Sequence, residues 1–250
     1  MAHQEGVDTA AAARAIREPP RPKQKRVYKT VTVDGPPYRV FLDGKPLSTP
    51  LRRPVIAPSR AMAEAVAAEW DAQVSEIDPA SMPVMRLVAT CIDKVQEGRS
   101  ALVDELMAHV DADLICYRAA GPAELKARQA RLWQPVVDWA AGRIGAEIRA
   151  GEGLMPFAQP VETAIALRRI AQALDDWRFT ALQAAAGITG SILLALAMTE
   201  GRLGAADAFA AALLDELYQQ ERWGADPLAK ARQDGIKADL EGVGRYLGLL

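Results

Sequence analysis

The side chains that could perform covalent or acid–base chemistry are few and widely separated. Only two histidines occur, His3 near the N-terminus and His109 in a segment of helical period. A hydrolase of the serine type needs a nucleophile beside such a base, and no serine lies in a Gly-x-Ser-x-Gly sequence. One alternative hypothesis is a hydrolase built on His109 with Asp104 or Glu105. The sequence otherwise predicts a protein that is not an enzyme.

Patterns for cofactors and metals are missing as well. The sequence contains neither the Walker phosphate loop nor the dinucleotide-binding glycine pattern. Cys91 and Cys116 lie far from both histidines, so no zinc spacing arises. Both cysteines fall in apolar stretches, which is typical of buried thiols in a reducing compartment. We therefore predict no cofactor, no metal and no disulfide.

Paired carboxylates remain as candidates for acid and base roles. The pairs are Asp104 with Glu105, Asp175 with Asp176, and Asp215 with Glu216. Adjacent residues of a helix point about 100° apart, so the members of a pair do not share a face. We interpret the first two pairs as solvated helix surface.

The third pair belongs to residues 205–223, for which the periodicity predicts one helix, mostly buried between its neighbours. Apolar Phe209, Leu213 and Trp223 fall near one direction. A polar strip holds Asp215, Gln219 and Arg222 at i, i+4 and i+7. A carboxylate on such a helix must be paired. Asp215 is expected either to bond Arg222 or a nearby backbone group, or to stand in a groove and meet a partner's donors.

The elements that carry these residues fall into two regions with different periods. Residues 26–58 alternate apolar and polar side chains, and Asp34-Gly35 and Asp43-Gly44 are dipeptides of tight hairpins. The prolines at 46, 50 and 54 lack a backbone donor, so the strands that hold them belong at sheet edges. Such an edge could accept a partner's strand, which makes a β-edge adaptor another alternative function.

After Pro58 the period becomes helical, with Ser59 as an N-cap and a second helix starting near Met82 and Pro83. Further helices are expected at residues 101–110, 122–148, 162–186, 191–200, 205–223 and 227–249. Residues 151–160 are expected to form a loop. The predicted fold is α+β, with a flexible tail at 1–25, a small β domain at 26–58 and an all-α domain at 59–250.

Composition bounds the possible partners. Of the 250 residues, 50% are hydrophobic and 25% charged, and the net charge is -2. This balance lacks the basic excess that attracts nucleic acid or an anionic membrane. The longest apolar run, residues 188–198, is shorter than the roughly 20 residues that cross a bilayer. We expect a soluble protein of the bacterial cytoplasm, with the mitochondrial matrix as the alternative, since Arg14 and Arg17 lie in an Ala-rich segment.

A set of motifs in fixed order gives a more specific indication. The first is VFLDGKPLSTP at residues 40–50, followed by AAEWDAQ at 67–73, IDP at 77–79 and MP at 82–83. Later motifs are DLICYRA at 113–119, Gln129 with WQP at 133–135, GS at 190–191, LALA at 194–197, and Asp215-Glu216 with Gln219 and Trp223-Gly224. From about Val27 to the C-terminus, the chain resembles the assembly chaperones of the ATP synthase alpha subunit.

The resemblance implies a small β domain, a helical domain, and a function without cofactor or turnover. It implies that the protein binds the free alpha subunit of the catalytic head, shields its subunit interface, and releases it to the beta subunit. The protein is expected to be monomeric when free. The family's acidic position, eight residues before the Trp-Gly pair, falls on Asp215. Partner-binding candidates are Asp215, Glu216, Gln219, Trp223, Glu69 and Trp70.

Overall fold

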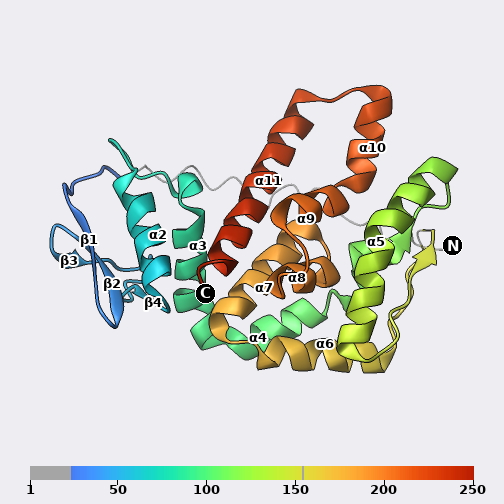
Figure 1. The fold of residues 1–250 in the computed structure, drawn as a ribbon, viewed down its shortest axis with the longest axis horizontal. Helices are drawn as coiled ribbons and strands as arrows, with labels where there is room; N and C mark the ends of the chain where they lie inside the picture. The colour runs from blue at the N-terminus through green and yellow to red at the C-terminus, as the bar shows by residue number, and fades with distance from the viewer. Residues whose placement is uncertain (1–23, 154) are drawn as a thin grey trace, which may run out of the picture.

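The computed structural model describes residues 24–153 and 155–250, and the tail predicted at 1–25 lies almost entirely outside them. Figure 1 shows a small sheet with α2 and α3 at one end and the remaining helices at the other. The predicted α+β class is confirmed. Among the described residues, no helix is both long enough and apolar enough to span a bilayer.

The sheet contains the predicted hairpins. Its strands are β1 (Val31–Asp34), β2 (Tyr38–Leu42), β3 (Lys45–Pro46) and β4 (Ile56–Ala57), and β2 pairs antiparallel with each of the others. Asp43 and Gly44 form the turn between β2 and β3 with φ of 47° and 75°, the left-handed region that this dipeptide tolerates. Pro46 lies on the short edge strand β3, as its missing donor requires.

The helical region begins where the period changes. Helix α2 (Arg60–Asp71) starts after Ser59, whose hydroxyl accepts from the Met62 amide at 3.0 Å, and α3 (Pro83–Thr90) starts with the predicted proline. A π-helical segment, η2 (Cys91–Val95), joins α3 to α4 (Gln96–Met107). The 3-10 turns are η1 (Pro79–Ser81), η3 (Val110–Ala112) and η4 (Leu114–Cys116).

The remaining elements differ from the expectations in three places. The helix expected at 162–186 is two helices, α6 (Val161–Ala173) and α7 (Asp176–Thr189), because Asp175 caps a new start by accepting from the Arg178 amide at 2.8 Å. Residues 205–223 also form two helices, α9 (Ala205–Ala212) and α10 (Leu214–Trp223). Strands β5 (Tyr117–Arg118) and β6 (Gly151–Glu152) pair in parallel within the domain expected to be all-α, and β6 opens the segment expected to be a loop.

The other helices agree with the expected segments within a few residues. They are α5 (Ala123–Ile144), α8 (Ile192–Thr199) and α11 (Pro227–Leu247). Helix α5 ends earlier than expected because Gly145 adopts φ of 66° and stops it. Helix α8 starts after Ser191, whose hydroxyl accepts from the Leu194 amide at 3.0 Å.

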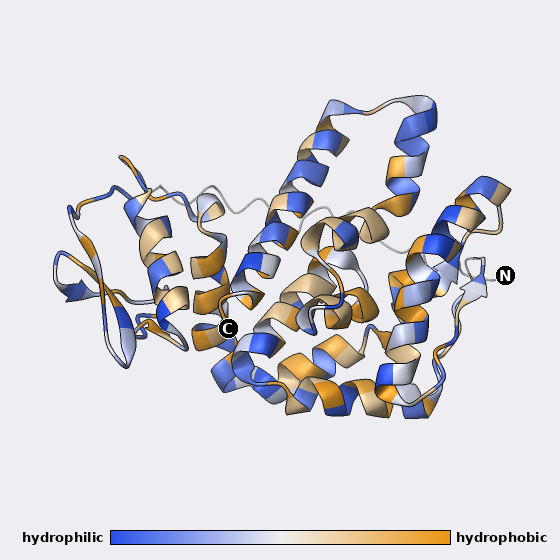
Figure 2. Cartoon of the chain, in the orientation of Figure 1, coloured by the Kyte–Doolittle hydropathy of each residue, from blue (hydrophilic) through white to orange (hydrophobic). Residues whose placement is uncertain are grey.

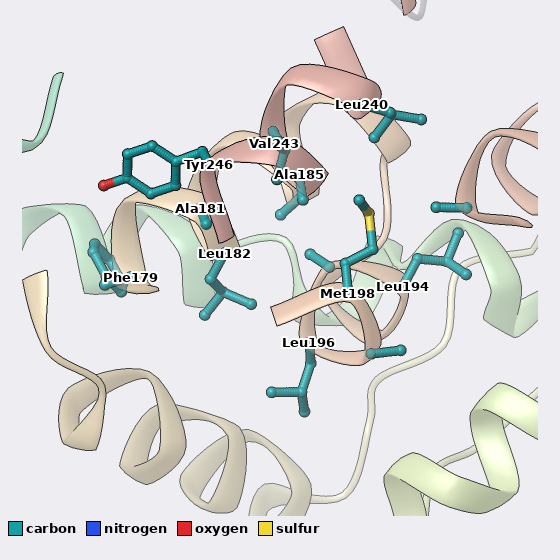
Figure 3. Packing of buried hydrophobic residues seen from close by; sticks show 14 of the residues in the cluster. Phe179, Ala181, Leu182, Ala185, Leu194, Leu196, Met198, Leu240, Val243 and Tyr246 are labelled. Atoms are coloured by element: carbon teal, nitrogen blue, oxygen red, sulfur yellow. The ribbon is translucent and has the colours of Figure 1, made fainter. Parts of the chain in front are cut away.

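The core is built around α8, in which seven of the eight residues are buried. Figure 3 shows Leu182 of α7, Leu194 and Leu196 of α8 and Tyr246 of α11 within this core. One buried apolar cluster extends from Tyr28 to Tyr246 and includes residues of both sheet and helices. The division into separate domains at residue 58 therefore stays a prediction. Figure 2 shows that hydrophilic residues dominate the outer turns of α11.

Candidate partner-binding surface

Helices α9 and α10 are separated at Leu213, which adopts φ of -105° and ψ of 15°. The indole N–H of Trp133 in α5 donates to the Ala211 carbonyl at 2.8 Å. In a continuous helix that carbonyl would be committed to the amide of residue 215. The expectation of one long helix was wrong: the chain breaks at Leu213, next to a carbonyl that bonds a residue distant in the sequence. Leu214 and Tyr218 of α10 are buried.

Asp215, the leading candidate from the sequence, is half-buried and bonded to another helix. Its Oδ1 accepts from Nε2 of Gln129 in α5 at 2.7 Å. The Gln129 side chain is 1% exposed, and its Oε1 accepts from the Ala119 amide at 2.8 Å. Both ends of this buried amide are therefore satisfied. The carboxylate joins α10 to α5 through Gln129, and not through Arg222 or a nearby backbone group, the two structural alternatives expected from the sequence.

A second polar group holds the same pair of helices together. Two guanidinium groups lie against the ring of buried Tyr218, with Cζ of Arg222 at 4.6 Å and Cζ of Arg128 at 5.1 Å from its centroid. Glu124 accepts from Arg222 at 2.5 Å and from Arg128 at 3.0 Å, and Arg128 also bonds Glu221 at 2.6 Å. We call Arg128, Tyr218, Arg222, Glu124, Glu221 and the Gln129–Asp215 pair the α5–α10 clasp. The pairing with Arg222 and Arg128 lowers the pKa of Glu124.

Glu216 connects α10 to α11. Its carboxylate accepts from Nε2 of buried Gln233 at 2.6 Å and pairs with Arg232. With the clasp on one side and this connection on the other, α10 has polar contacts to both α5 and α11, and its Leu214 and Tyr218 belong to the buried core.

The outer face of α10 carries the other two candidates. Gln219 is exposed, and Trp223 is 77% exposed at the last turn. Leu228, just across the turn that joins α10 to α11, is 80% exposed. The expectation that Trp223 joins Phe209 and Leu213 in a buried stripe was wrong, because the break at Leu213 changes the direction of the helix. A large apolar side chain is instead displayed to solvent.

The two candidates on α2 have a different environment. Glu69 is 5% exposed, and its carboxylate oxygens accept from the Val84 amide at 2.9 Å and the Met85 amide at 2.8 Å. It thereby caps the start of α3, where orphan amides need acceptors. Burial raises the pKa of Glu69 although both amides oppose the shift. A guanidinium nitrogen of Arg245 lies 3.9 Å from Oε1 of Glu69.

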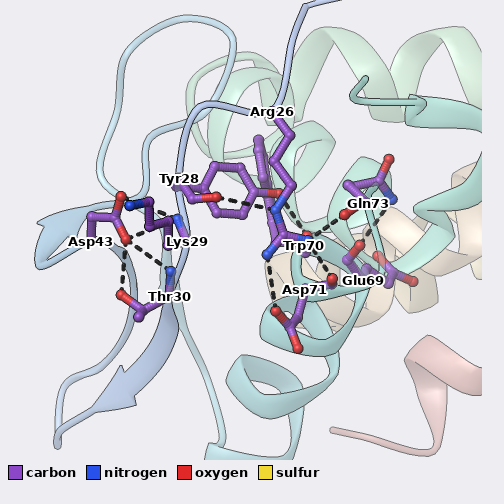
Figure 4. A network of polar contacts seen from close by, with 9 residues as sticks. All are labelled: Arg26, Tyr28, Lys29, Thr30, Asp43, Glu69, Trp70, Asp71 and Gln73. Carbon is purple, nitrogen blue, oxygen red and sulfur yellow. Dashed lines mark hydrogen bonds and ion pairs between the residues drawn. The ribbon is translucent and has the colours of Figure 1, made fainter. Parts of the chain in front are cut away.

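Trp70 is half-buried beside Tyr28, with ring centroids 5.8 Å apart in an edge-on arrangement (Figure 4). The Tyr28 hydroxyl donates to the Trp70 carbonyl at 2.6 Å. Arg26 adds contacts to the carbonyls of Asp71 and Gln73. These bonds attach the N-terminal segment to the end of α2, so both α2 candidates have structural partners. Their contact with another protein stays a prediction.

The residues of the hydrolase hypothesis are not organised as a triad. His109 is exposed and lines a cavity of about 490 Å³ together with Glu105 and Ser191. The Ser191 hydroxyl is buried and serves as the cap of α8, and Asp104 pairs with Arg168 on α6. No cluster of three or more potential metal ligands occurs among residues 24–153 and 155–250.

The sequence motifs included Gln129 but suggested no function for it, and Glu124 and Arg128 were missed. Their partners on α10 lie 86 to 98 residues away, from Gln129–Asp215 to Arg222–Glu124. The only local signal was the pair Glu124 and Arg128 at i, i+4 near the start of a helix. Pairings over such sequence separations depend on the tertiary fold.

Comparisons with known proteins place this chain and its fold in one group of chaperones. A family model described as ATP12 chaperone protein matches residues 25–141. The crystal structure of Atp12 from Paracoccus denitrificans is 35% identical, with a TM-score of 0.84 over 90% of this chain and 98% of that one. An aspartate-to-lysine mutant of the same protein gives a TM-score of 0.83 at 34% identity, over 90% of this chain and 97% of that one.

Two further relatives indicate the same family. The structure of a putative chaperone from Agrobacterium tumefaciens is 39% identical, with a TM-score of 0.84 over 90% of this chain and 85% of that one. The mitochondrial Atp12 protein of Schizosaccharomyces pombe is 24% identical over 219 residues, which are 82% of this chain and 75% of that protein. The chain belongs to the ATP12 chaperone family.

Proposed function

We propose that this protein is an assembly chaperone for the catalytic head of the F-type ATP synthase. It binds the free alpha subunit, shields its subunit interface, and releases it when the beta subunit arrives. Its function requires neither turnover nor a cofactor. A subunit of an alternating ring exposes apolar interfaces before its neighbours arrive, and such surfaces aggregate unless they are covered reversibly.

The observation that carries the proposal is the similarity to Atp12 of P. denitrificans over nearly the whole of both chains. Bacterial and mitochondrial relatives both occur. We therefore place the protein in a bacterial cytoplasm, with the mitochondrial matrix as the alternative, and expect it to be monomeric when free.

On this proposal, the outer face of α10 contacts the alpha subunit. Gln219 and Trp223 are exposed there, whereas Asp215 and Glu216 are already bonded to Gln129 and to Gln233. The exposed pair makes direct contact, and the bonded pair orients the helix that presents it. Exposed aromatic side chains frequently become the anchors of protein interfaces because they bury a large area at low entropic cost.

The decisive experiment mixes the purified full-length protein with separately expressed alpha and beta subunits. We expect a complex with alpha alone, slower aggregation of alpha on warming, and displacement of the chaperone when beta is added. Absence of a complex with alpha in size-exclusion chromatography and in calorimetry would overturn the proposal.

Two variants separate this proposal from the alternatives. His109→Ala would abolish activity if a hydrolase were built on His109, whereas the chaperone keeps full binding. Blocking strand addition by a proline at Val33 of β1, whose amide points away from β2, would abolish binding by a β-edge adaptor. The chaperone instead binds alpha through α10, so a folded Val33→Pro variant retains that interaction.

A further inference from the structure

A surface groove of about 960 Å³ lies at the sheet end of the molecule, away from α10. Its lining comes from the N-terminal segment with Tyr28, the turn with Leu51, α3 and η2. Trp70 and Met85 also line it. We call this surface the α3 groove. Its size is at the upper end of the range of ligand clefts.

The turn along one side of the groove is held rigidly. Oδ1 of Asp93 accepts from the Thr49 hydroxyl at 2.6 Å, and Oδ2 accepts from the Leu51 amide at 3.2 Å. Arg53 donates to the Ile92 carbonyl at 2.9 Å. Despite these bonds the Leu51 side chain is 61% exposed. A fixed turn thus displays an apolar side chain at the groove, so little ordering entropy would be lost when a partner covers it.

The charges around the groove have one dominant sign. Exposed Lys25, Arg52 and Lys94 line it, whereas the carboxylate of Asp93 is already bonded to the turn. Arg86 also lines it and pairs with Asp239 at 2.5 Å. The protein as a whole has a net charge of -2, so this basic lining is a local feature. Charge complementarity favours a partner segment with acidic side chains.

The lining includes the π-helical segment η2, which carries both Asp93 and Lys94. Segments of this kind are rare and occur disproportionately at functional sites. Asp93 bonds the turn while Lys94, the next residue, is exposed at the groove. The η2 segment therefore holds the turn that exposes Leu51 and also supplies a positive charge at the groove.

We propose that the α3 groove binds an extended segment of the client chain in which an apolar side chain is flanked by Asp or Glu. The apolar side chain packs on Leu51 and Met85, and its acidic neighbours face Lys94 and Arg52. This inference rests on the proposed chaperone function and adds a second contact surface to that of α10.

The first test compares two charge insertions at exposed apolar positions. Leu51→Glu places a carboxylate at the groove, and Val161→Glu makes the same change at a 69% exposed residue of α6 outside it. Binding of the full-length variants to fluorescently labelled alpha subunit is then titrated. We expect Leu51→Glu to weaken the affinity by about tenfold and Val161→Glu by less than about twofold.

The second test reverses charge. Lys94→Glu should weaken binding, and the loss should shrink as salt is raised, because exposed charge pairs are screened. Lys237→Glu, an exposed lysine on α11, is the control and should bind like wild type. A photo-crosslinker at position 51 should capture a client peptide containing Asp or Glu.

The outcomes separate the two proposals. If wild-type protein does not bind alpha, the chaperone proposal fails. If wild type binds alpha and folded Leu51→Glu and Lys94→Glu bind equally well, the groove proposal is overturned and the chaperone proposal stands. Crosslinking from position 51 to a second copy of this chain, or to an alpha peptide without acidic residues, also overturns the groove proposal.

Discussion

Two helices of this molecule carry an acidic residue and a tryptophan that resemble family motifs, and they use them in different ways. In α2, Glu69 is 5% exposed and caps α3, and Trp70 is half-buried against Tyr28. In α10, Asp215 bonds a side chain of α5, and Trp223 is 77% exposed. Similar residue types therefore build the structure in one helix and present a surface in the other.

The difference follows from what surrounds each helix. Helix α2 lies between the sheet and α3, so its acidic side chain must satisfy buried amides. Helix α10 is attached through the clasp and through Glu216, and its outer face is exposed. The comparison predicts that changes in α2 reduce the free energy of unfolding, whereas changes at the end of α10 reduce binding.

The largest effect on stability is expected for Glu69→Ala. This change leaves the amides of Val84 and Met85 buried without an acceptor and opens a space, which should lower the free energy of unfolding by about 3 kcal/mol. The measurement is urea unfolding followed by circular dichroism. Glu64→Ala is the matched control, because Glu64 lies on the same helix with its side chain 58% exposed. Equal losses for the two variants would contradict the role assigned to Glu69.

Asp113 is a second buried acid, besides Glu69, whose contribution to stability can be tested. It is 3% exposed, it accepts from the Leu193 amide at 3.0 Å, and burial raises its pKa from the ordinary 3.8 to about 6. Because the pKa of Asp113 is higher in the folded than in the unfolded state, the folded protein binds more protons between pH 3.8 and about 6. The stability contribution is complete below pH 3.8 and is lost as pH rises through 6, a change of about 3 kcal/mol.

Asp113→Asn removes this titration, so the difference in stability between wild type and variant should change by about 3 kcal/mol between acidic and neutral pH. Urea unfolding of both proteins across that range measures it. A difference that is the same at every pH would show that Asp113 does not titrate as its burial requires.

A smaller effect is expected for Asp215→Ala. Removing the carboxylate leaves Nε2 of the buried Gln129 without its acceptor, which should lower stability by about 1–2 kcal/mol. The loosened α10 should also bind alpha more weakly. Asp215→Asn is the control, since its carbonyl oxygen can still accept from Gln129. If Asp215→Asn lost as much stability as Asp215→Ala, charge and not the hydrogen bond would fix α10.

What the sequence predicted well depends on neighbouring residues. The turn at Asp43 and Gly44 requires left-handed φ, and the caps Ser59 and Ser191 act on amides three residues away. The α+β class followed from periodicity and from the resemblance. None of these features needs knowledge of which distant segments meet.

What the sequence missed depends on contacts between distant segments. The break at Leu213 coincides with a bond from Trp133, and the partner of Asp215 is Gln129 of another helix. Asp175 is exposed, as expected, but it also caps a new helix, so the single helix expected at 162–186 was wrong. This error was avoidable, since Asp is a preferred N-cap residue. The environment of Trp223 could not be read from a helical wheel that assumed one straight helix.

The smallest effect on stability, and the sharpest test of the comparison, is expected for Trp223→Ser. A side chain that is 77% exposed contributes little to the core, so the free energy of unfolding should stay within about 0.5 kcal/mol of wild type. Affinity for alpha should nevertheless fall by about tenfold, because an aromatic anchor is lost. Calorimetric titration and urea unfolding of the same preparation separate the two quantities. A stability loss without a binding loss would show that Trp223, like the residues of α2, stabilises the fold and does not bind the partner.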